Sequence, residues 1–288
     1  MKVCVLGGDN RQLEIIKQLQ ESCDITLVGY ENLNSFQNLK KSRMPDIHIS
    51  EFDAIILPVS GINSDSSIKT SFGENFSVSN SLFCYTKKDV LIFTGVMTDK
   101  LGEMLKRSNR QATVLMKDED VIKQNTIPTV EGIIADIVYN TDTTINDSNV
   151  FIIGYGNIGK RLEYYLDLLG ANITIGVIDT KDLIELSNLN KNVILTTSGV
   201  QMEEVLGSTD VIVNTAPSSV LNPRNLRNTN TDAYVLDISS EPYGVDFEYA
   251  SSRGIRSKLL SGIPSKVAPK TAGLILTKKI EHKIKEGI

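Results

Sequence analysis

The chain has 288 residues, 41% of them hydrophobic and 23% charged, with a formal net charge of −5. This length exceeds the usual size of one hydrophobic core, so we expect two domains. The acidic balance and the lack of a Lys/Arg-rich stripe argue against a nucleic-acid partner. No apolar run reaches the roughly 20 residues that cross a bilayer, so no membrane-spanning segment is expected.

The three cysteines, Cys4, Cys23 and Cys84, form no CxxC pair. An odd number at wide spacing suits a reducing compartment better than a disulfide framework. The two histidines, His48 and His282, have no neighbours at metal-ligand spacing, so no metal site is expected. The first residues lack the charged region and cleavage site of a signal peptide, and we expect a cytoplasmic protein.

Short apolar runs alternate with helical patterns through the first half of the chain. Strands are predicted at residues 3–7, 25–29, 54–60, 90–95 and 112–116. Runs that are apolar on both faces and separated by helices indicate βαβ units and a parallel sheet, so residues 1–127 are predicted to form one α/β domain. Residues 60–80 are rich in Ser, Asn and Gly and lack a period, which is typical of a long surface loop.

The middle of the chain predicts an inter-domain helix over residues 128–147. Pro128 and Glu131 stand near its start, where proline is tolerated and an acid interacts favourably with the helix dipole. A second α/β series over residues 148–268 is predicted to be a dinucleotide-binding Rossmann domain, and residues 269–288 a closing amphipathic helix. The predicted fold class is α/β, with two Rossmann-like, doubly wound parallel-sheet domains.

The strongest motif is G-x-G-x-x-G, formed by Gly154, Gly156 and Gly159 directly after an apolar strand and at the start of a helix. The first glycine permits a tight turn, the second lets a pyrophosphate approach the backbone, and the third lets helix and strand pack closely. Helix N–H groups then face the anion. The residues between these glycines are predicted to belong to the same cofactor-binding loop: Tyr155, Asn157 and Ile158.

The cofactor's ribose should meet an acid about 20 residues beyond the glycines. Asp179 has that spacing, and it either binds the ribose or caps the helix that begins near Thr180. Alternatively, Gly176 occupies the position where the acid is expected, and a glycine there leaves room for the 2′-phosphate of NADP. Val177, which is also predicted to contact the cofactor, and Ile178 supply no arginine to bind that phosphate, so the sequence leaves both NADP and NAD as candidates.

Two later strands of the same domain end in polar residues. Open α/β sheets bind ligands at such strand ends, so these residues are predicted to adjoin the cofactor: Asn214, Thr215, Ala216 and Asp237. For Asp237, a role in forming the turn is the alternative.

Seven stretches carry a family resemblance: GGDNRQLE from Gly7, ILPVS from Ile56, IPTVEG from Ile127, GYGNIG from Gly154, NTAPS from Asn214, LDISSEPYGVDF from Leu236 and GIPSKVAPKTAG from Gly262. The chain resembles the dipicolinate synthase A subunits over nearly its whole length. Such proteins are similar in architecture to alanine dehydrogenase and the 2-hydroxyacid dehydrogenases. This implies that the substrate domain comes first, the cofactor domain second, the final helix returns to the first domain, and the active site lies in the cleft between them.

The resemblance also implies a function in endospore-forming bacteria. The expected reaction, on a branch of the lysine pathway, converts 4-hydroxy-tetrahydrodipicolinate to dipicolinate, with NADP⁺ as hydride acceptor and NAD⁺ as the alternative. With this function we expect a small dicarboxylate substrate and a location in the mother cell. We also expect a homo-oligomer that works with a flavoprotein-like B subunit of the synthase. The sequence departs from the family at Tyr243 and Ser265, which replace glycines, and at Ile178, where relatives can carry an arginine.

This chemistry must hold two carboxylates, remove a proton and transfer a hydride. Arg11 is the first predicted carboxylate anchor because its planar guanidinium binds such groups in a bidentate way. Lys266 and Lys270, which flank the last turn, are the second and third. As alternatives, Arg11 pairs with Glu14 and the lysines are merely solvated.

Four more residues complete the predicted catalytic set. Asp9 either orients Arg11 or acts as an acid/base. Ser60 and Thr129 offer hydroxyls to a carboxylate or act as caps, and Glu131 is either a general base or a favourable charge at a helix start. No histidine lies in a suitable acid/base motif, which disfavours a 2-hydroxyacid dehydrogenase. An amino- or imino-acid dehydrogenase and a non-catalytic protein that only binds a dinucleotide remain alternatives.

Overall fold

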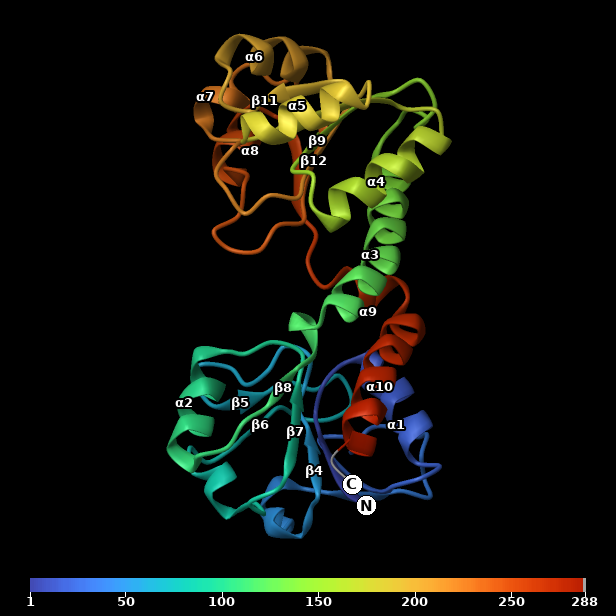
Figure 1. The fold of residues 1–288 in the computed structure, drawn as a ribbon, viewed down its shortest axis with the longest axis vertical. Coiled ribbons are helices and arrows are strands. Elements are labelled where there is room, and N and C mark those ends of the chain that lie inside the picture. The colour runs from blue at the N-terminus through green and yellow to red at the C-terminus, as the bar shows by residue number, and fades with distance from the viewer. Residues whose placement is uncertain (287–288) are drawn as a thin grey trace. The chain divides into compact units, whose positions relative to one another are not determined.

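The computed structural model describes residues 1–286 (Figure 1). The chain divides into two compact units. Unit 1 comprises Met1–Asn125 together with the C-terminal segment from Pro264, and unit 2 comprises Thr126–Ile263. No helix in residues 1–286 is both long and apolar enough to cross a membrane.

Unit 1 is built on a sheet of six parallel strands in the order β3-β2-β1-β4-β7-β8. The strands are β1 (Lys2–Leu6), β2 (Asp24–Val28), β3 (Lys40–Ser42), β4 (Ala54–Ile56), β7 (Leu91–Thr94) and β8 (Thr113–Val114). Helices α1 (Asn10–Leu19), α2 (Asp99–Ser108) and α10 (Pro269–Glu286) cover the sheet, and η1 (Met44–Asp46), η2 (Ile49–Glu51), η3 (Leu82–Tyr85) and η4 (Leu115–Lys117) are short 3₁₀ turns.

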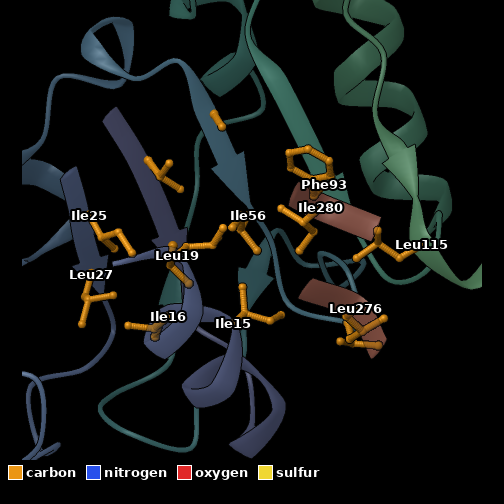
Figure 2. Packing of buried hydrophobic residues seen from close by; sticks show 14 of the residues in the cluster. Ile15, Ile16, Leu19, Ile25, Leu27, Ile56, Phe93, Leu115, Leu276 and Ile280 are labelled. Atoms are coloured by element: carbon orange, nitrogen blue, oxygen red, sulfur yellow. The ribbon is translucent and has the colours of Figure 1, made fainter. Parts of the chain in front are cut away.

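The final helix α10 packs against α1 within unit 1. A Cβ on Gly273 of α10 would lie only 2.6 Å from the backbone oxygen of Arg11, so the two helices are in close contact. Figure 2 shows Ile15 of α1 and Leu276 and Ile280 of α10 in one apolar cluster, together with Phe93 of the sheet. This cluster fills one side of the sheet, and a second cluster fills the other.

Unit 2 repeats the same strand order, β11-β10-β9-β12-β13-β14, again with six parallel strands. The strands are β9 (Asn149–Ile153), β10 (Asn172–Val177), β11 (Val193–Leu195), β12 (Val211–Asn214), β13 (Tyr234–Asp237) and β14 (Arg256–Leu259). The helices are α4 (Asn157–Leu168), α5 (Thr180–Asn188), α6 (Gly199–Ser208), α7 (Pro223–Leu226) and α8 (Phe247–Ser252), and α9 (Ile263–Val267) follows. Both sheets have the strand order of dinucleotide-binding folds, which confirms the predicted α/β class.

Helix α3 (Glu119–Asn140) corrects the predicted helix over residues 128–147. It begins earlier because the Asp118 carboxylate accepts a hydrogen bond from the Val121 backbone N–H, and acidic residues occupy the first turn. Pro128 therefore lies inside the helix rather than at its start. Buried side chains farther along, among them Ile133 and Ile137, hold the helix to the core of unit 2 and offset the interior proline.

Candidate functional site

The glycine-rich turn after β9 has the form that a dinucleotide requires. Gly154 has a φ of +93°, which favours glycine, and a Cβ on Gly159 would lie 2.3 Å from the Gly154 oxygen. By contrast, a Cβ on Gly156 would meet no atom within 4 Å. Helix α4 begins immediately afterwards and has no side-chain cap. The turn thus leaves open space in front of uncapped helix N–H groups, which fits a pyrophosphate.

Thr215 ties the end of β12 to this turn. Its hydroxyl donates to the backbone oxygens of Ile153, at 3.0 Å, and Gly154, at 3.3 Å. Ala216 follows and is half-buried. Both residues therefore stand beside the glycine turn. Of the remaining loop residues, Asn157 is exposed and Ile158 is half-buried against the core of unit 2.

Asn214 and Asp237 are completely buried, which corrects their prediction as direct cofactor contacts. The Asp237 carboxylate accepts hydrogen bonds from the Asn214 amide at 3.0 Å and from the backbone N–H groups of Ser239, Gly244 and Val245. Their polar atoms are thus used within the protein. The pair shapes the loops after β12 and β13, which is the turn-forming alternative.

The residues predicted to contact the cofactor's ribose lie at and just after the end of β10. Gly176 lies in the sheet, where a Cβ would meet the Phe151 ring at 2.8 Å, and Val177 is buried. Asp179 occupies the N-cap position of α5, but its side chain makes no capping bond and is exposed. Side-chain capping is therefore not its role here, and ribose binding stays a prediction.

Tyr155, which lies within the glycine turn, belongs to a cluster of polar and charged side chains. Its hydroxyl donates to Glu163 at 3.3 Å, Lys191 pairs with the same carboxylate, and the ammonium of Lys160 lies 5.5 Å from the tyrosine ring centre. Burial and the neighbouring Glu163 raise the pKa of Tyr155, and the hydrogen bond to Glu163 raises the pKa of Lys191. The sequence analysis missed this cluster. The sequence feature that could have indicated the cluster is Glu163, an acidic residue next to the buried Leu162 on an amphipathic helix.

The equivalent turn in unit 1, after β1, is bound by the backbone of a distant segment of the same unit. Gly8 donates its N–H to the Lys69 oxygen at 2.8 Å and accepts from the Ser71 N–H at 2.8 Å. The Tyr30 hydroxyl donates to the Gly7 oxygen at 2.7 Å. The two units share a strand order, yet a Cβ on Gly8 would lie 2.4 Å from the Gln12 side chain, whereas a Cβ on Gly156 would meet no atom within 4 Å.

The segment that bonds to this turn lies within residues 60–80, which were predicted to form a surface loop. The structure corrects that prediction. It contains the antiparallel pair β5 (Ser67–Ile68) and β6 (Phe76–Ser77), and Thr70 forms an isolated bridge with Gly8. Its backbone partners are distant in sequence, so no local period reveals them.

Arg11 pairs with Asp9 and not with Glu14, which corrects the alternative pairing. Its guanidinium donates to the two Asp9 carboxylate oxygens at 2.9 and 2.6 Å, while Glu14 accepts from Gln18. Asp9 also caps α1 by accepting from the Arg11 N–H. The orienting role foreseen for Asp9 is therefore present in the structure.

A hollow of about 320 Å³ lies beside this pair in unit 1. Its lining brings together the predicted residues Asp9 and Ser60 and adds residues that sequence reasoning missed. The full lining is Gly8, Asp9, Ser60, Lys69, Thr70, Ser71 and Asn75.

The other predicted catalytic residues lie outside this lining. Lys266 on α9 and Lys270 in the first turn of α10 are exposed and belong to unit 1. Thr129 is buried on α3, Glu131 is exposed on the same helix, and both belong to unit 2. Their roles stay predictions.

Family comparisons agree with these features. Residues 2–116 match the N-terminal domain of the dipicolinate synthase A subunit, and residues 131–245 match the ThiF family. The dipicolinate synthase A subunit of Bacillus subtilis (strain 168) is 34% identical over 289 residues, covering 99% of this chain and 96% of that protein.

Solved structures give the same result. The crystal structure of the dipicolinate synthase A subunit from Bacillus halodurans has a TM-score of 0.91 at 32% identity, covering 98% of this chain and 97% of that one. The corresponding crystal structure from Bacillus subtilis has a TM-score of 0.89 at 33% identity, covering 100% and 96%. An L-alanine dehydrogenase shares the fold, with a TM-score of 0.61 at 13% identity over 99% of this chain and 89% of that one. Because the first two matches extend along nearly the whole of each chain, this protein belongs to the family of dipicolinate synthase A subunits.

Proposed function

We propose that this chain oxidises 4-hydroxy-tetrahydrodipicolinate, or the dihydrodipicolinate derived from it, to dipicolinate, with NADP⁺ or NAD⁺ as the acceptor. The observation that carries the proposal is the open glycine turn at Gly156 in a chain of this family. Bound there, a nicotinamide dinucleotide supplies the hydride acceptor. The chain's own residues must then bind the cofactor and hold a small dicarboxylate.

The cofactor is proposed to lie over the turn from Gly154 to Gly159. The N–H groups at the start of α4 would bind its pyrophosphate, and the Asp179 carboxylate would accept hydrogen bonds from the adenosine ribose. Thr215 and Ala216 border the same turn and would line the path toward the nicotinamide. A carboxylate at Asp179 favours a free ribose hydroxyl, whereas the family resemblance favours NADP, so both cofactors belong in the assay.

The substrate is proposed to bind in unit 1. The hollow beside the Asp9–Arg11 pair offers hydrogen-bond donors and lies at the carboxyl end of β1, where open α/β sheets bind their ligands.

The family supports a proposal for the biological setting. We propose a role in dipicolinate formation during sporulation, in the cytoplasm of the mother cell, as a homo-oligomer that works together with the B subunit of the synthase.

The test uses the purified full chain with enzymatically generated 4-hydroxy-tetrahydrodipicolinate. NADP⁺ and NAD⁺ are supplied in separate reactions, with and without the B subunit, and the ultraviolet absorbance of the pyridine product is followed. We expect product with at least one cofactor. No product in any combination contradicts the proposal. Turnover of other imino acids alone would indicate an amino- or imino-acid dehydrogenase, and tight cofactor binding without turnover a non-catalytic protein.

A further inference from the structure

We propose that Lys69 is the charged contact for one carboxylate of the substrate, in the hollow that the β1–α1 turn and the β5–β6 segment form in unit 1. The inference rests on the proposed function, because it names the residue that recognises the dicarboxylate. Sequence reasoning assigned that task to Arg11, Lys266 and Lys270.

The backbone around Lys69 is fixed against the β1–α1 turn. The Lys69 oxygen accepts from the Gly8 N–H, and the Ser71 N–H donates to the Gly8 oxygen, each at 2.8 Å. Between them, the Thr70 hydroxyl donates to the Gly29 oxygen at 2.6 Å. These bonds hold Lys69 at the hollow before any ligand arrives, so binding needs to order only its side chain.

The distribution of charge favours Lys69 over Arg11. The Arg11 side chain is only 10% exposed, and Asp9 neutralises it through two hydrogen bonds. Lys69 is exposed, and its ammonium is not held in a salt bridge within residues 1–286, although its charge helps to lower the pKa of the nearby exposed Asp65 carboxyl. The lining residues Asp9 and Lys69, with the neighbouring Arg11, carry one net positive charge, which suits one carboxylate, and the exposed Asp65 outside the lining offsets part of it.

Other side chains at the hollow can also donate hydrogen bonds. The hydroxyls of Ser60 and Ser71 have no hydrogen-bond partner among the described residues. The Asn75 oxygen accepts from the Thr70 N–H at 3.0 Å, which leaves the Asn75 amide N–H₂ able to donate. The volume of about 320 Å³ is at the small end of the range of about 300–1,000 Å³ for ligand sites, as expected for a single ring.

A buried polar atom next to the hollow has no partner. The side-chain amide nitrogen of Gln12 makes no hydrogen bond in the described chain, although this residue is only 1% exposed. The amide lies against Gly8, which lines the hollow. Gln12 itself does not line the hollow, so Lys69 carries the inference.

The test compares Lys69→Met with Lys106→Met in the full chain, with the B subunit present. Lys106 is exposed on α2 and does not line the hollow, so the control makes the same change in net charge. The affinity for dipicolinate is measured by titration calorimetry, and the KM values for substrate and cofactor by steady-state kinetics. We expect Lys69→Met to weaken dipicolinate binding and raise the substrate KM about tenfold to hundredfold, as for one lost charge-assisted hydrogen bond. The cofactor KM and the Lys106→Met control should stay unchanged, and Lys69→Arg should recover part of the affinity.

The inference is overturned if Lys69→Met matches Lys106→Met in both dipicolinate affinity and substrate KM. It is also overturned if Lys69→Met raises the cofactor KM as much as the substrate KM, because the residue would then not be specific to the dicarboxylate. Either result, in an enzyme that still makes the pyridine product, leaves the proposed function intact. Lys69-dependent binding of dipicolinate without any turnover would support the anchor and contradict the proposed reaction.

Discussion

The guanidinium of Arg11 donates two hydrogen bonds to the carboxylate of Asp9, at 2.9 Å and 2.6 Å, at the point where β1 turns into α1. Because Asp9 lines the hollow in unit 1, Arg11 sets the charge there even though it is itself nearly buried. Without the guanidinium, the Asp9 carboxylate would be an unpaired negative charge and would repel a carboxylate of the substrate.

We therefore predict that Arg11→Ala lowers kcat/KM for the substrate about tenfold to hundredfold. Cofactor affinity should be nearly unchanged, because the open glycine turn belongs to unit 2. Steady-state kinetics and a cofactor titration check this. An unaltered kcat/KM would remove Arg11 from the site.

Asp9→Asn separates the two roles that the sequence left open for Asp9. Asparagine is also a good N-cap, so α1 should stay intact. If Asp9 only orients Arg11, the substrate KM should change and kcat should persist, since no proton acceptor has been lost. A large loss of kcat at unchanged KM would instead indicate an acid/base role.

Two glycines of one turn test the cofactor site. Gly156 has an extended backbone, with φ −77° and ψ −164°, and a Cβ there meets nothing, so Gly156→Val should fold normally. It should weaken NADP(H) and NAD(H) binding at least about tenfold, because the side chain would occupy the pyrophosphate's approach. Gly159→Ala should lower the Tm, since its Cβ would lie 2.3 Å from a backbone oxygen. Equal cofactor affinity in Gly156→Val and the unaltered chain would contradict this placement of the pyrophosphate.

The glycine turn of unit 2 could be predicted from the sequence because the residues that indicate it are close together in the chain. An apolar strand, three glycines at fixed spacing and an amphipathic helix follow one another from Asn149 to Leu168, and the structure has those elements in place. The unit 1 hollow was not readable in the same way. Lys69 meets Gly8 through backbone bonds between distant segments, and a composition rich in serine and asparagine gave no sign of them.

Charge pairing was also hard to foresee. A helical spacing of three points Arg11 toward Glu14, but the fork geometry of its guanidinium instead fits Asp9, which the N-cap position holds beside it. Similarly, Asn214 and Asp237 end neighbouring strands as expected, yet their burial turns them toward the loop backbone.

A further prediction concerns the ion pair behind the glycine turn. Glu163 is 7% exposed and accepts from both Tyr155 and Lys191. Glu163→Leu should destabilise the protein by about 1–3 kcal/mol, because it leaves the partners' polar groups without their acceptor. The exposed Glu185→Leu on α5 is the matched control and should change the stability little. Chemical denaturation checks both.

The same pair gives an alkaline pH dependence. The pKa of Lys191 is raised above its ordinary value of 10.5 in the folded protein, so folding holds that proton more tightly. The stabilisation is therefore complete below pH 10.5 and is lost as the pH rises through the raised pKa. The Tm difference between the unaltered chain and Lys191→Met should shrink over that interval. A difference that stays constant from pH 8 to about pH 11 would contradict the role of the ion pair.

The last prediction concerns how α3 is held to the sheet of unit 2. The Tyr234 hydroxyl on β13 donates to the Asp136 carboxylate on α3 at 2.6 Å, and Lys258 on β14 pairs with the same carboxylate. Tyr234 is 4% exposed, so Tyr234→Phe removes a buried hydrogen bond to a charged group and should cost about 1.5–3 kcal/mol. Tyr139→Phe, at an 87% exposed position of α3, should be neutral.

Asp136→Ala should cost more than Tyr234→Phe, because it leaves the buried Tyr234 hydroxyl and the Lys258 ammonium without their common partner. Burial and the neighbouring Asp136 hold the pKa of Tyr234 above its ordinary value of 10.0, so the folded state retains the phenolic proton. This contribution is complete below pH 10.0 and is lost at higher pH, and the Tyr234→Phe chain should lack that part of the alkaline destabilisation. Denaturation midpoints from pH 7 to about pH 11 measure it, and parallel curves for the two chains would show that the hydroxyl makes no such contribution.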